Sequence, residues 1–435
     1  MSTAMLNPLP RQSFRQTETA SAADSAAAPV PLPRFITRQP LLDGDFRLLG
    51  YELGIKEASP LPVLPGANSM RQIRDEALLV SVIDPEYQKA MNHRLTLLKI
   101  DPTTLDNPLL ENLPRENSVL AVHPGNPTPA LLARCQTLSR EGYALALDEA
   151  AVLPGMLPLA QQSRFLRFDV GDTDLMSLCD RLVRIQGIQG PRLIARNVES
   201  EETFAACRKL SFDLFQGYFF TRPLPSAARA IDTSRLRIIK LMNLVISHAE
   251  FPLIEVQFKL DPGLAFKMLR FINSPAVGLR HPIRSIGHAL IMLGHDQLYR
   301  WLTLLLFTHQ EADGRSRAQL RNALVRARFV EILGQDGVKK EDRDGLFIVG
   351  ILSMLEALLN LPMERVLAPL NLSEPILAAL LHGRGIYAPY LLLATACEGN
   401  DSDATARLAE TLGLCPETVN LAHLHALIWS EGMDV

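Results

Sequence analysis

From Phe35 onward, short apolar runs alternate with longer amphipathic stretches, and this alternation limits the possible folds more than any other feature of the chain. The apolar runs are LTLLKID (95–101), SVLAVHP (118–124), YALALDEA (143–150), RFLRFDV (164–170) and PRLIARNV (191–198). Between them lie stretches such as TPALLARCQTLSREG (128–142), which has the apolar spacing of a helix. Strands that alternate with helices form βαβ units and a parallel sheet. The sequence therefore predicts an α/β domain of the TIM-like (β/α) barrel type.

The strand signals stop at FTRPLPSAARAIDTS (220–234), a segment of prolines and small residues typical of a linker. After it, stretches such as TSRLRIIKLMNLVISHAE (233–250) have apolar residues at helical spacing. The first residues are rich in Ala, Ser, Pro and Thr and bury too little to order. We predict a disordered tail (1–33), a barrel domain (34–224), a linker (225–232) and an all-helical domain (233–435).

Composition and charge narrow the class of protein. Apolar residues make up 47% of the 435, enough for real cores, and the net charge of −3 gives no general attraction to nucleic acid. The five cysteines form no CxxC pair, which favours a reducing compartment. We see no signal peptide, and apolar runs such as WLTLLLF (301–307) are far below the ~20 residues of a membrane span. A cytoplasmic protein without membrane or nucleic-acid partners is expected.

Three stretches resemble known families. FITRQPLLDGDFRLLGYELGIKEA (35–58) resembles the opening of EAL-domain proteins, the cyclic di-GMP phosphodiesterases, and FDLFQGYFFTRPLP (212–225) is similar to the segment that closes their barrel. LDPGLAFKMLRFINSPAVGLRHPIRSIGHALIMLGHDQL (260–298) resembles an HDOD domain, a relative of metal-dependent HD hydrolases that lacks their ligands. The pairing looks like the EAL–HDOD signalling proteins of bacteria. It implies an EAL barrel followed by an all-helical HDOD domain.

The resemblance implies roles for single positions, because two-metal phosphodiester hydrolysis needs carboxylates that bridge the cations. Glu52 matches the Glu of the family's motif. Lys56 stands where the family has a phosphate-binding Arg, so the charge stays but the bidentate geometry is lost. Asp101 stands at the place of a metal-binding Asn. Ala121 replaces a metal-binding Glu, and a methyl group is no ligand.

Asp148 and Glu149 stand at the family's Asp-Asp pair, with Glu149 one methylene too long. Arg167 stands at the family's active-site Lys, whose role a bulkier and always charged guanidinium does not fill unchanged. Arg196 falls at the general-base Glu, where it inverts the local charge. Gln216 of the closing strand is retained.

These replacements predict a chain that is not an enzyme, with no metal or other cofactor, and with Asp148 paired to Arg167 or Arg196. The favoured hypothesis is an inactive EAL–HDOD regulatory protein that contacts a protein partner through its HDOD domain. One alternative is a residual cyclic di-GMP phosphodiesterase that uses Mg²⁺ or Mn²⁺ with Glu52 and Asp169 among its carboxylates. The other is a sensor that binds a cyclic dinucleotide without cleaving it, through Arg167, Arg196 and Lys56.

Two features of the helical half have structural interpretations. His295 and Asp296 in GHDQ resemble an HD dyad, but Gly294 just before them predicts a helix end, so Asp296 is interpreted as a helix cap and not as a metal ligand. QLRNALVRARF (319–329) is a basic amphipathic stretch, interpreted as a helix with a solvated positive face.

Overall fold

The computed structural model describes residues 34–57, 67–122, 128–149, 157–171, 174–224, 233–273, 283–308, 314–399 and 402–433. The predicted tail (1–33) and linker (225–232) lie outside these residues. The described parts form an eight-stranded closed barrel followed by a helical region, which confirms the predicted α/β plus all-α class.

The barrel strands fall where the apolar runs predict them. The strands are β1 (Arg34–Asp43), β2 (Leu48–Glu57), β3 (Leu95–Ile100), β4 (Ser118–Val122), β5 (Ala144–Asp148), β6 (Phe165–Asp169), β7 (Arg192–Arg196) and β8 (Leu214–Gln216). Strands β2 to β8 pair in parallel in sequence order, whereas β1 is antiparallel to both β2 and β8. The first two strands are therefore a hairpin, and the barrel departs from eight identical βα units.

Helices α1 to α6 connect the barrel strands: α1 (Ala67–Ile83), α2 (Pro85–Met91), α3 (Pro129–Arg140), α4 (Leu157–Gln162), α5 (Leu175–Arg184) and α6 (Glu201–Lys209). Their starts follow local capping chemistry. For α3, the Thr128 hydroxyl accepts from the backbone N–H of Leu131 at 3.2 Å, and Pro129 occupies the first turn, where no hydrogen bond is lost.

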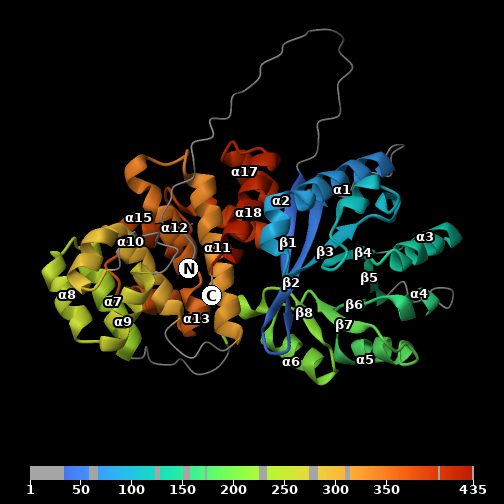
Figure 1. Cartoon of the computed structure of the whole chain (residues 1–435), viewed down its shortest axis with the longest axis horizontal. Helices are drawn as coiled ribbons and strands as arrows, with labels where there is room; N and C mark the ends of the chain where they lie inside the picture. Colours follow the sequence, from blue (N-terminus) through green and yellow to red (C-terminus); the bar gives the residue numbers. More distant parts are fainter. Residues whose placement is uncertain are drawn as a thin grey trace, which may run out of the picture.

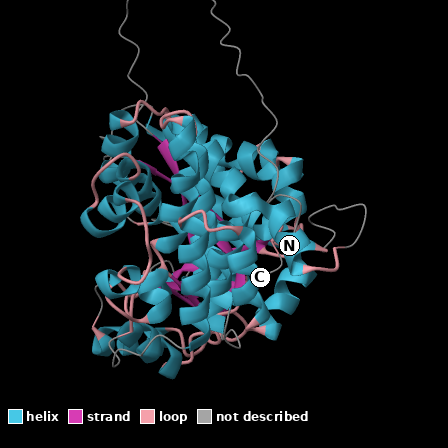
Figure 2. Cartoon of the chain, turned by 90° about the vertical axis from the view of Figure 1, so that its left-hand side faces the viewer, coloured by secondary structure: helices cyan, strands magenta, loops and turns pink. Residues whose placement is uncertain are grey.

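The helical region holds α7 (Thr233–Ile246), α8 (Phe251–Lys259), α9 (Pro262–Ile272), α10 (Ile286–Thr308), α11 (Gly314–Gly334), α12 (Arg343–Leu352), α13 (Leu355–Leu359), α14 (Met363–Leu367), α15 (Glu374–His382), α16 (Ala388–Glu398), α17 (Ser402–Thr411) and α18 (Pro416–Glu431). Figure 1 shows α7 to α10 at the end of the molecule farthest from the barrel, with α11, α17 and α18 between them and β1. Seen from the helical side, helices lie in front of the strands (Figure 2).

Side-chain alternation along the strands fills the barrel. Small and large apolar residues from successive strands meet inside it, among them Ala121, Ala146 and Phe165, each fully buried. Because successive strand residues point to opposite faces, the next inward positions toward the carboxyl ends carry the polar residues of the site described below.

The last helices pack on the barrel and share a buried apolar cluster with its first strands. Residues of β1 and β2 share one buried apolar cluster with residues of α16 and α18, and α18 packs against both β1 and α2. The chain returns to its first strand at its end, so the barrel and the C-terminal helices bury a common apolar surface.

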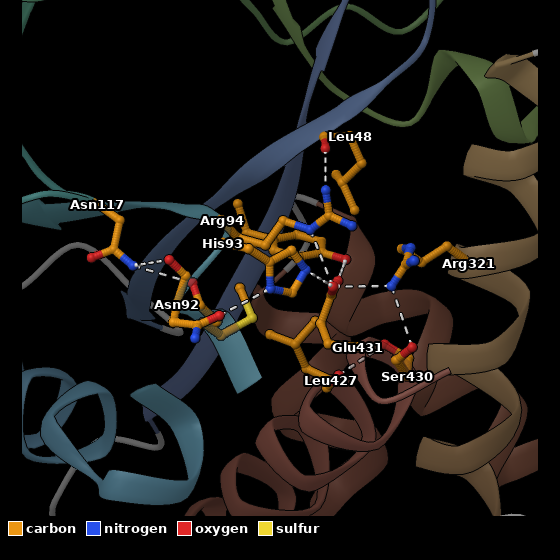
Figure 3. Close-up of polar contacts among 11 residues, drawn as sticks. Leu48, Asn92, His93, Arg94, Asn117, Arg321, Leu427, Ser430 and Glu431 are labelled. Atoms are coloured by element: carbon orange, nitrogen blue, oxygen red, sulfur yellow. Dashed lines mark hydrogen bonds and ion pairs between the residues drawn. The ribbon is translucent and has the colours of Figure 1, made fainter. Parts of the chain in front are cut away.

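A buried carboxylate, Glu431 at the end of α18, joins these helices to the barrel (Figure 3). Its side chain is fully buried and pairs with Arg94 at 3.1 Å, with Arg321 of α11 at 3.0 Å and with His93 at 3.1 Å. The Tyr51 hydroxyl donates to its other oxygen at 3.0 Å. The Glu431 carboxylate therefore forms ion pairs with Arg94 of the barrel and with Arg321 of the helical region.

A second buried network crosses the same boundary. Arg38 of β1 donates to His423 of α18 at 3.3 Å and to Asn322 of α11 at 3.0 Å. Burial and the charge of Arg38 lower the pKa of His423 to about 3, so its ring is neutral and accepts the bond from Arg38. Arg326 forms a bidentate pair with Glu398 of α16, at 3.0 and 2.6 Å.

These contacts correct the interpretation of residues 319–329. They lie in α11, where Arg326 is buried and Arg321 reaches Glu431, so this positive face is largely buried in ion pairs and not solvated. The apolar spacing predicts the helix correctly, but it carries no information on the distant acids that pair with its arginines. In the described part of the chain, each helix is too short or too polar to cross a bilayer.

Helix α10 is broken at Gly294. This residue has φ 67°, a left-handed conformation that glycine adopts at little cost, and the helix resumes after it. The break confirms the predicted helix end at Gly294. The predicted capping role of Asp296 is not found, because its carboxylate has no hydrogen-bond partner among the described residues.

Candidate active site at the carboxyl ends of the barrel strands

The carboxyl ends of the parallel strands bring together five predicted site residues. Glu52 lies on β2, Asp148 ends β5, Arg167 lies on β6, Arg196 ends β7 and Gln216 ends β8. These are the inward-facing positions directly above the apolar interior of the barrel. The resemblance thus selects residues that the closed barrel brings together in one cluster.

Arg167 lies at the centre of this cluster and bridges its acids. One terminal nitrogen lies 2.8 Å from Glu52 Oε2, and the other lies 2.6 Å from Asp148 Oδ1. The side chain is among the largest fully buried ones of the described residues. A buried guanidinium needs such carboxylates, because an unpaired charge in this position would be very costly.

Arg196 adds a second positive charge to the same two acids. Its guanidinium lies 3.4 Å from Asp148 Oδ1 and 3.9 Å from Glu52 Oε1. Gln216 completes the group by donating to Glu52 Oε2 at 3.1 Å. The predicted pairing of Asp148 with Arg167 or Arg196 is therefore present with both arginines.

The ion pairs fix the charge state of Glu52. Burial alone would raise its pKa, but Arg167 and Arg196 outweigh burial, and the pKa lies below the usual 4.5. Burial works against the charge of Arg196 as well, yet its pKa is raised because Glu52 and Asp148 stabilise the guanidinium. Glu52 is therefore ionised at neutral pH.

Lys99 belongs to the same site, and the sequence analysis missed it. It lies on β3, where Leu95 and Leu97 point into the barrel, so strand alternation directs its side chain to the same opening. Partial burial lowers its pKa, as does repulsion from Arg196 and Arg167, although the side chain reaches solvent. Among the described residues its ammonium group has no ion-pair partner. The signal that would have found it is the one charged residue in LTLLKI.

Asp148 and Glu149, adjacent in sequence, turn to different partners. Glu149 forms an ion pair with Arg181 of α5. Burial raises the pKa of Glu149, and repulsion from Asp148 and Asp169 adds to this increase although Arg181 opposes it. Its Oε2 atom has no hydrogen-bond partner among the described residues. The two acids therefore do not act as one bridging pair.

The other predicted positions lie at the rim or outside the pocket. Asp169 accepts from Asn197 at 2.7 Å. Asp101 holds the turn after β3, because its carboxylate accepts from the backbone N–H and the hydroxyl of Thr103. Ala121 is fully buried in the apolar barrel interior. Lys56 lies on β2, but its side chain is outside the described part.

The side chains of this arrangement do not fit a pair of divalent cations. Glu52 and Asp148 already bind arginines, and Ala121 offers no oxygen where the family has a ligand. No group of three or more His, Cys, Asp or Glu side chains within the described ranges could hold a metal ion. The site is a mixed cluster of carboxylates and fixed positive charges.

Comparison with known proteins identifies the first part of the helical region. The family model of the HDOD domain matches residues 233–363. This part of the chain is an HDOD domain. The predicted combination of an EAL-type barrel and an HDOD domain is confirmed, because the HDOD match follows an eight-stranded barrel and because a protein named a cyclic di-GMP phosphodiesterase is similar over nearly the whole chain.

That relative is the cyclic di-GMP phosphodiesterase CdgJ of Vibrio cholerae serotype O1. It is 27% identical over 409 residues, which cover 92% of this chain and 93% of the relative. The uncharacterized protein YuxH of Bacillus subtilis is 24% identical and covers 92% of this chain and 98% of its own length.

Solved structures are similar to part of the chain. The PaMucR phosphodiesterase in complex with c-di-GMP has a TM-score of 0.36 at 17% identity and covers 45% of this chain and 98% of its own. The EAL-domain protein of Listeria monocytogenes has a TM-score of 0.34 at 16% identity and covers 44% and 89%.

The prediction that a chain of this kind is not an enzyme is contradicted by CdgJ, a relative that is similar over 93% of its own length and is named a phosphodiesterase. The prediction judged each motif position by itself. It took every replaced ligand or base as lost chemistry, and it left out Lys99, which the barrel places at the same opening.

Proposed function

We propose that the protein acts in cyclic di-GMP signalling and that its barrel binds this dinucleotide and hydrolyses one of its phosphodiester bonds. The whole-length similarity to CdgJ supports this function. The observation that carries the proposal within this chain is the Lys99 ammonium group, which forms no ion pair with another described residue and lies beside the Arg167–Arg196 cluster.

The positive side chains are suited to a phosphodiester. Lys99 offers a point charge that Glu52 and Asp148 attract but that forms no ion pair among the described residues, and Arg196 holds Asp148 only at 3.4 Å. A bound phosphate would restore the pKa of Lys99, because an opposite charge stabilises the ammonium form. Buried Arg167 is held between two acids and acts as the fixed charge that keeps the pocket in shape.

Glu149 is the carboxylate that best fits proton removal from an attacking water. A general base works best with a pKa near the working pH, and burial moves the pKa of Glu149 upward from 4.5. Its buried Oε2 atom has no hydrogen-bond partner among the described residues, so this oxygen can accept a proton from a water molecule that reaches it. Arg181 fixes the position of the group.

The test uses the full-length protein with cyclic di-GMP. Binding is measured by calorimetry, and formation of the linear dinucleotide is followed by chromatography. Lys99→Met should weaken binding about tenfold, since a charge-assisted contact is lost. Glu149→Gln should lower kcat by about 10²- to 10⁴-fold with little change in binding. The matched controls, Lys89→Met and Glu141→Gln, change exposed residues on α2 and after α3 and should have no effect.

The outcomes separate the two parts of the proposal. Binding without any linear product would refute hydrolysis and leave recognition of the dinucleotide. Absence of binding at tens of micromolar ligand would refute both parts. Turnover that survives Glu149→Gln unchanged would remove that residue from the reaction.

A protein partner of the HDOD domain remains a prediction. Two exposed apolar side chains, Leu260 directly after α8 and Phe266 on α9, are the place to test it. If a partner binds there, replacing both with serine should abolish capture of that partner from the source cell and leave the barrel activity unchanged. Capture that is the same with the double variant would exclude this surface.

A further inference from the structure

The barrel cluster holds a side-chain cation between two acids that the family resemblance assigns to metal ions. The resemblance implies that carboxylates at the positions of Glu52 and Asp148 bind divalent cations. In this chain one guanidinium lies between them, with Nη1 of Arg167 at 2.8 Å from Glu52 Oε2 and Nη2 at 2.6 Å from Asp148 Oδ1. The two arms of a guanidinium reach both acids at once, which the single point charge of an ammonium group does not.

The oxygens of the two acids are already engaged. Glu52 Oε2 also accepts from Gln216 at 3.1 Å, and Glu52 Oε1 lies 3.9 Å from Arg196. Asp148 Oδ1 lies 3.4 Å from Arg196 as well. The position on β4 that the resemblance assigns to a further ligand holds Ala121, which is fully buried. Since Mg²⁺ demands a near-ideal octahedron of oxygens, this cluster offers it too few.

Burial keeps Arg167 in place against a competing cation. Its side chain has no exposed surface, and its neighbours on β6, Leu166 and Phe168, belong to the apolar core. A guanidinium displaced from the acids would remain buried without a partner, which is very costly. A divalent cation would therefore have to compensate for that cost before it gained any ligand.

The inner cluster has a surplus of positive charge. Two negative charges face three positive ones, which belong to Arg167, Arg196 and Lys99. The guanidinium of Arg196 keeps 14% of its side-chain surface and Lys99 is exposed, so both can meet an incoming phosphate. A divalent cation at the same place would be repelled by all three side chains.

The acids at the rim do not change this balance in favour of a metal ion. Glu149 forms its ion pair with Arg181. Asp169 accepts from Asn197 at 2.7 Å and lies opposite Arg196 in the register of β6 and β7. Each of these carboxylates already faces a donor or a cation.

We propose that Arg167 takes the place of the divalent cation in this barrel, so that the protein binds cyclic di-GMP without Mg²⁺ or Mn²⁺. Its guanidinium neutralises Glu52 and Asp148, and the phosphate then approaches Arg196 and Lys99 without repulsion from bare acids. Arg167 is a positioning residue, because it is buried beneath the groups that meet the ligand. The inference rests on the proposed function for its ligand, but its statement about cations concerns the free protein and is tested separately.

The first test uses the full-length wild-type protein after removal of metals with EDTA. Mn²⁺ titrations followed by electron paramagnetic resonance should show no saturable site that depends on Glu52 up to about 1 mM, the weak end of carboxylate sites. The Kd for cyclic di-GMP, measured by calorimetry at equal ionic strength, should agree within about twofold in EDTA and in MnCl₂. Turnover to the linear dinucleotide should likewise be unchanged by EDTA.

The second test removes the guanidinium. Arg167→Met keeps an unbranched side chain and leaves two acids without their central cation, so it should bind Mn²⁺ at least about tenfold more tightly than wild type. In EDTA it should bind cyclic di-GMP about tenfold more weakly, and Mn²⁺ should restore that affinity. Rescue by a metal ion distinguishes lost charge from general damage to the fold. Arg164→Met, an exposed control just before β6, should gain no Mn²⁺ site.

The outcomes separate this inference from the proposed function. A saturable Mn²⁺ site in wild type that Glu52→Gln removes would overturn the inference, as would a loss of dinucleotide affinity in EDTA. Equal Mn²⁺ binding by Arg167→Met and Arg164→Met would also overturn it. If Arg167→Met does not fold, the wild-type measurements decide. Absence of dinucleotide binding with and without Mn²⁺ would refute the proposed function, while the Mn²⁺ titration of the free protein would still decide whether Arg167 excludes the cation.

Discussion

Replacement of Glu431 by Gln tests whether the barrel and the helical half are held together by the buried carboxylate in Figure 3. The carboxylate has no exposed surface and meets Arg94, Arg321, His93 and the Tyr51 hydroxyl within 3.1 Å. Gln keeps the size of the side chain but removes the charge, and its NH₂ group faces nitrogen donors that it does not satisfy.

The magnitude follows from the exposure of the partners. Removing one member of a buried ion pair costs about 3–5 kcal/mol. Arg94 and Arg321 keep 18% and 12% of their side-chain surface, so water can partly replace the lost contact, and about 3 kcal/mol is the appropriate figure. Unfolding entropy of about 2.1 cal/mol/K per residue over roughly 350 described residues converts this loss into a Tm lower by about 4 °C.

The assay is calorimetric thermal unfolding at low ionic strength, with Glu417→Gln on the same helix as the matched control. Glu417 is exposed, so this variant should unfold within about half a degree of the wild type. A double-mutant cycle with Arg321→Gln should give a coupling free energy of about 1–2 kcal/mol. Equal unfolding of Glu431→Gln and Glu417→Gln would refute the conclusion that this carboxylate joins the two halves.

Three further predictions concern single side chains. Because the pKa of Glu52 lies below 4.5 in the folded state, its ion pairs stabilise the protein above the unfolded-state pKa, and this contribution is lost as the pH falls through the folded-state value. The stability difference between wild type and Glu52→Gln, measured by urea unfolding, should therefore be largest near pH 7 and shrink below about pH 4; a difference that is constant with pH would contradict the assigned pairs. Arg196→Glu replaces a cation beside two acids by a third acid, so Mn²⁺ titrations followed by electron paramagnetic resonance should show a gain in affinity that Arg192→Glu, at the other end of β7, does not share; equal gains would place the effect in the net charge alone. Tyr299→Phe removes a buried hydroxyl without a hydrogen bond and should raise the free energy of unfolding by about 1 kcal/mol, whereas a loss of stability would reveal a partner for the hydroxyl.

The candidate site was predictable only in part. Strand alternation and the family resemblance select Glu52, Asp148, Arg167, Arg196 and Gln216, and the barrel brings these five together. The same reasoning placed Ala121 and Asp101 in the pocket by position, where the structure has a packed methyl group and a turn. A motif position says where a residue stands along a strand, but its chemistry depends on the side chains of strands that are distant in sequence.

The sequence by itself determined the local order of the chain. Apolar spacing along LTLLKI and YALALD specifies strands, and Gly294 ends a helix, because these effects act between residues a few positions apart. Only the tertiary structure decided which charges meet. Glu431 pairs with Arg94, which lies 337 positions away in sequence, and Arg167 pairs with Glu52, which lies 115 positions away. Closure of the barrel and the return of α18 to the first strands bring these side chains together in space. Whether an arginine is solvated, bridges two acids or is available to a phosphate depends on that closure, which no local pattern records.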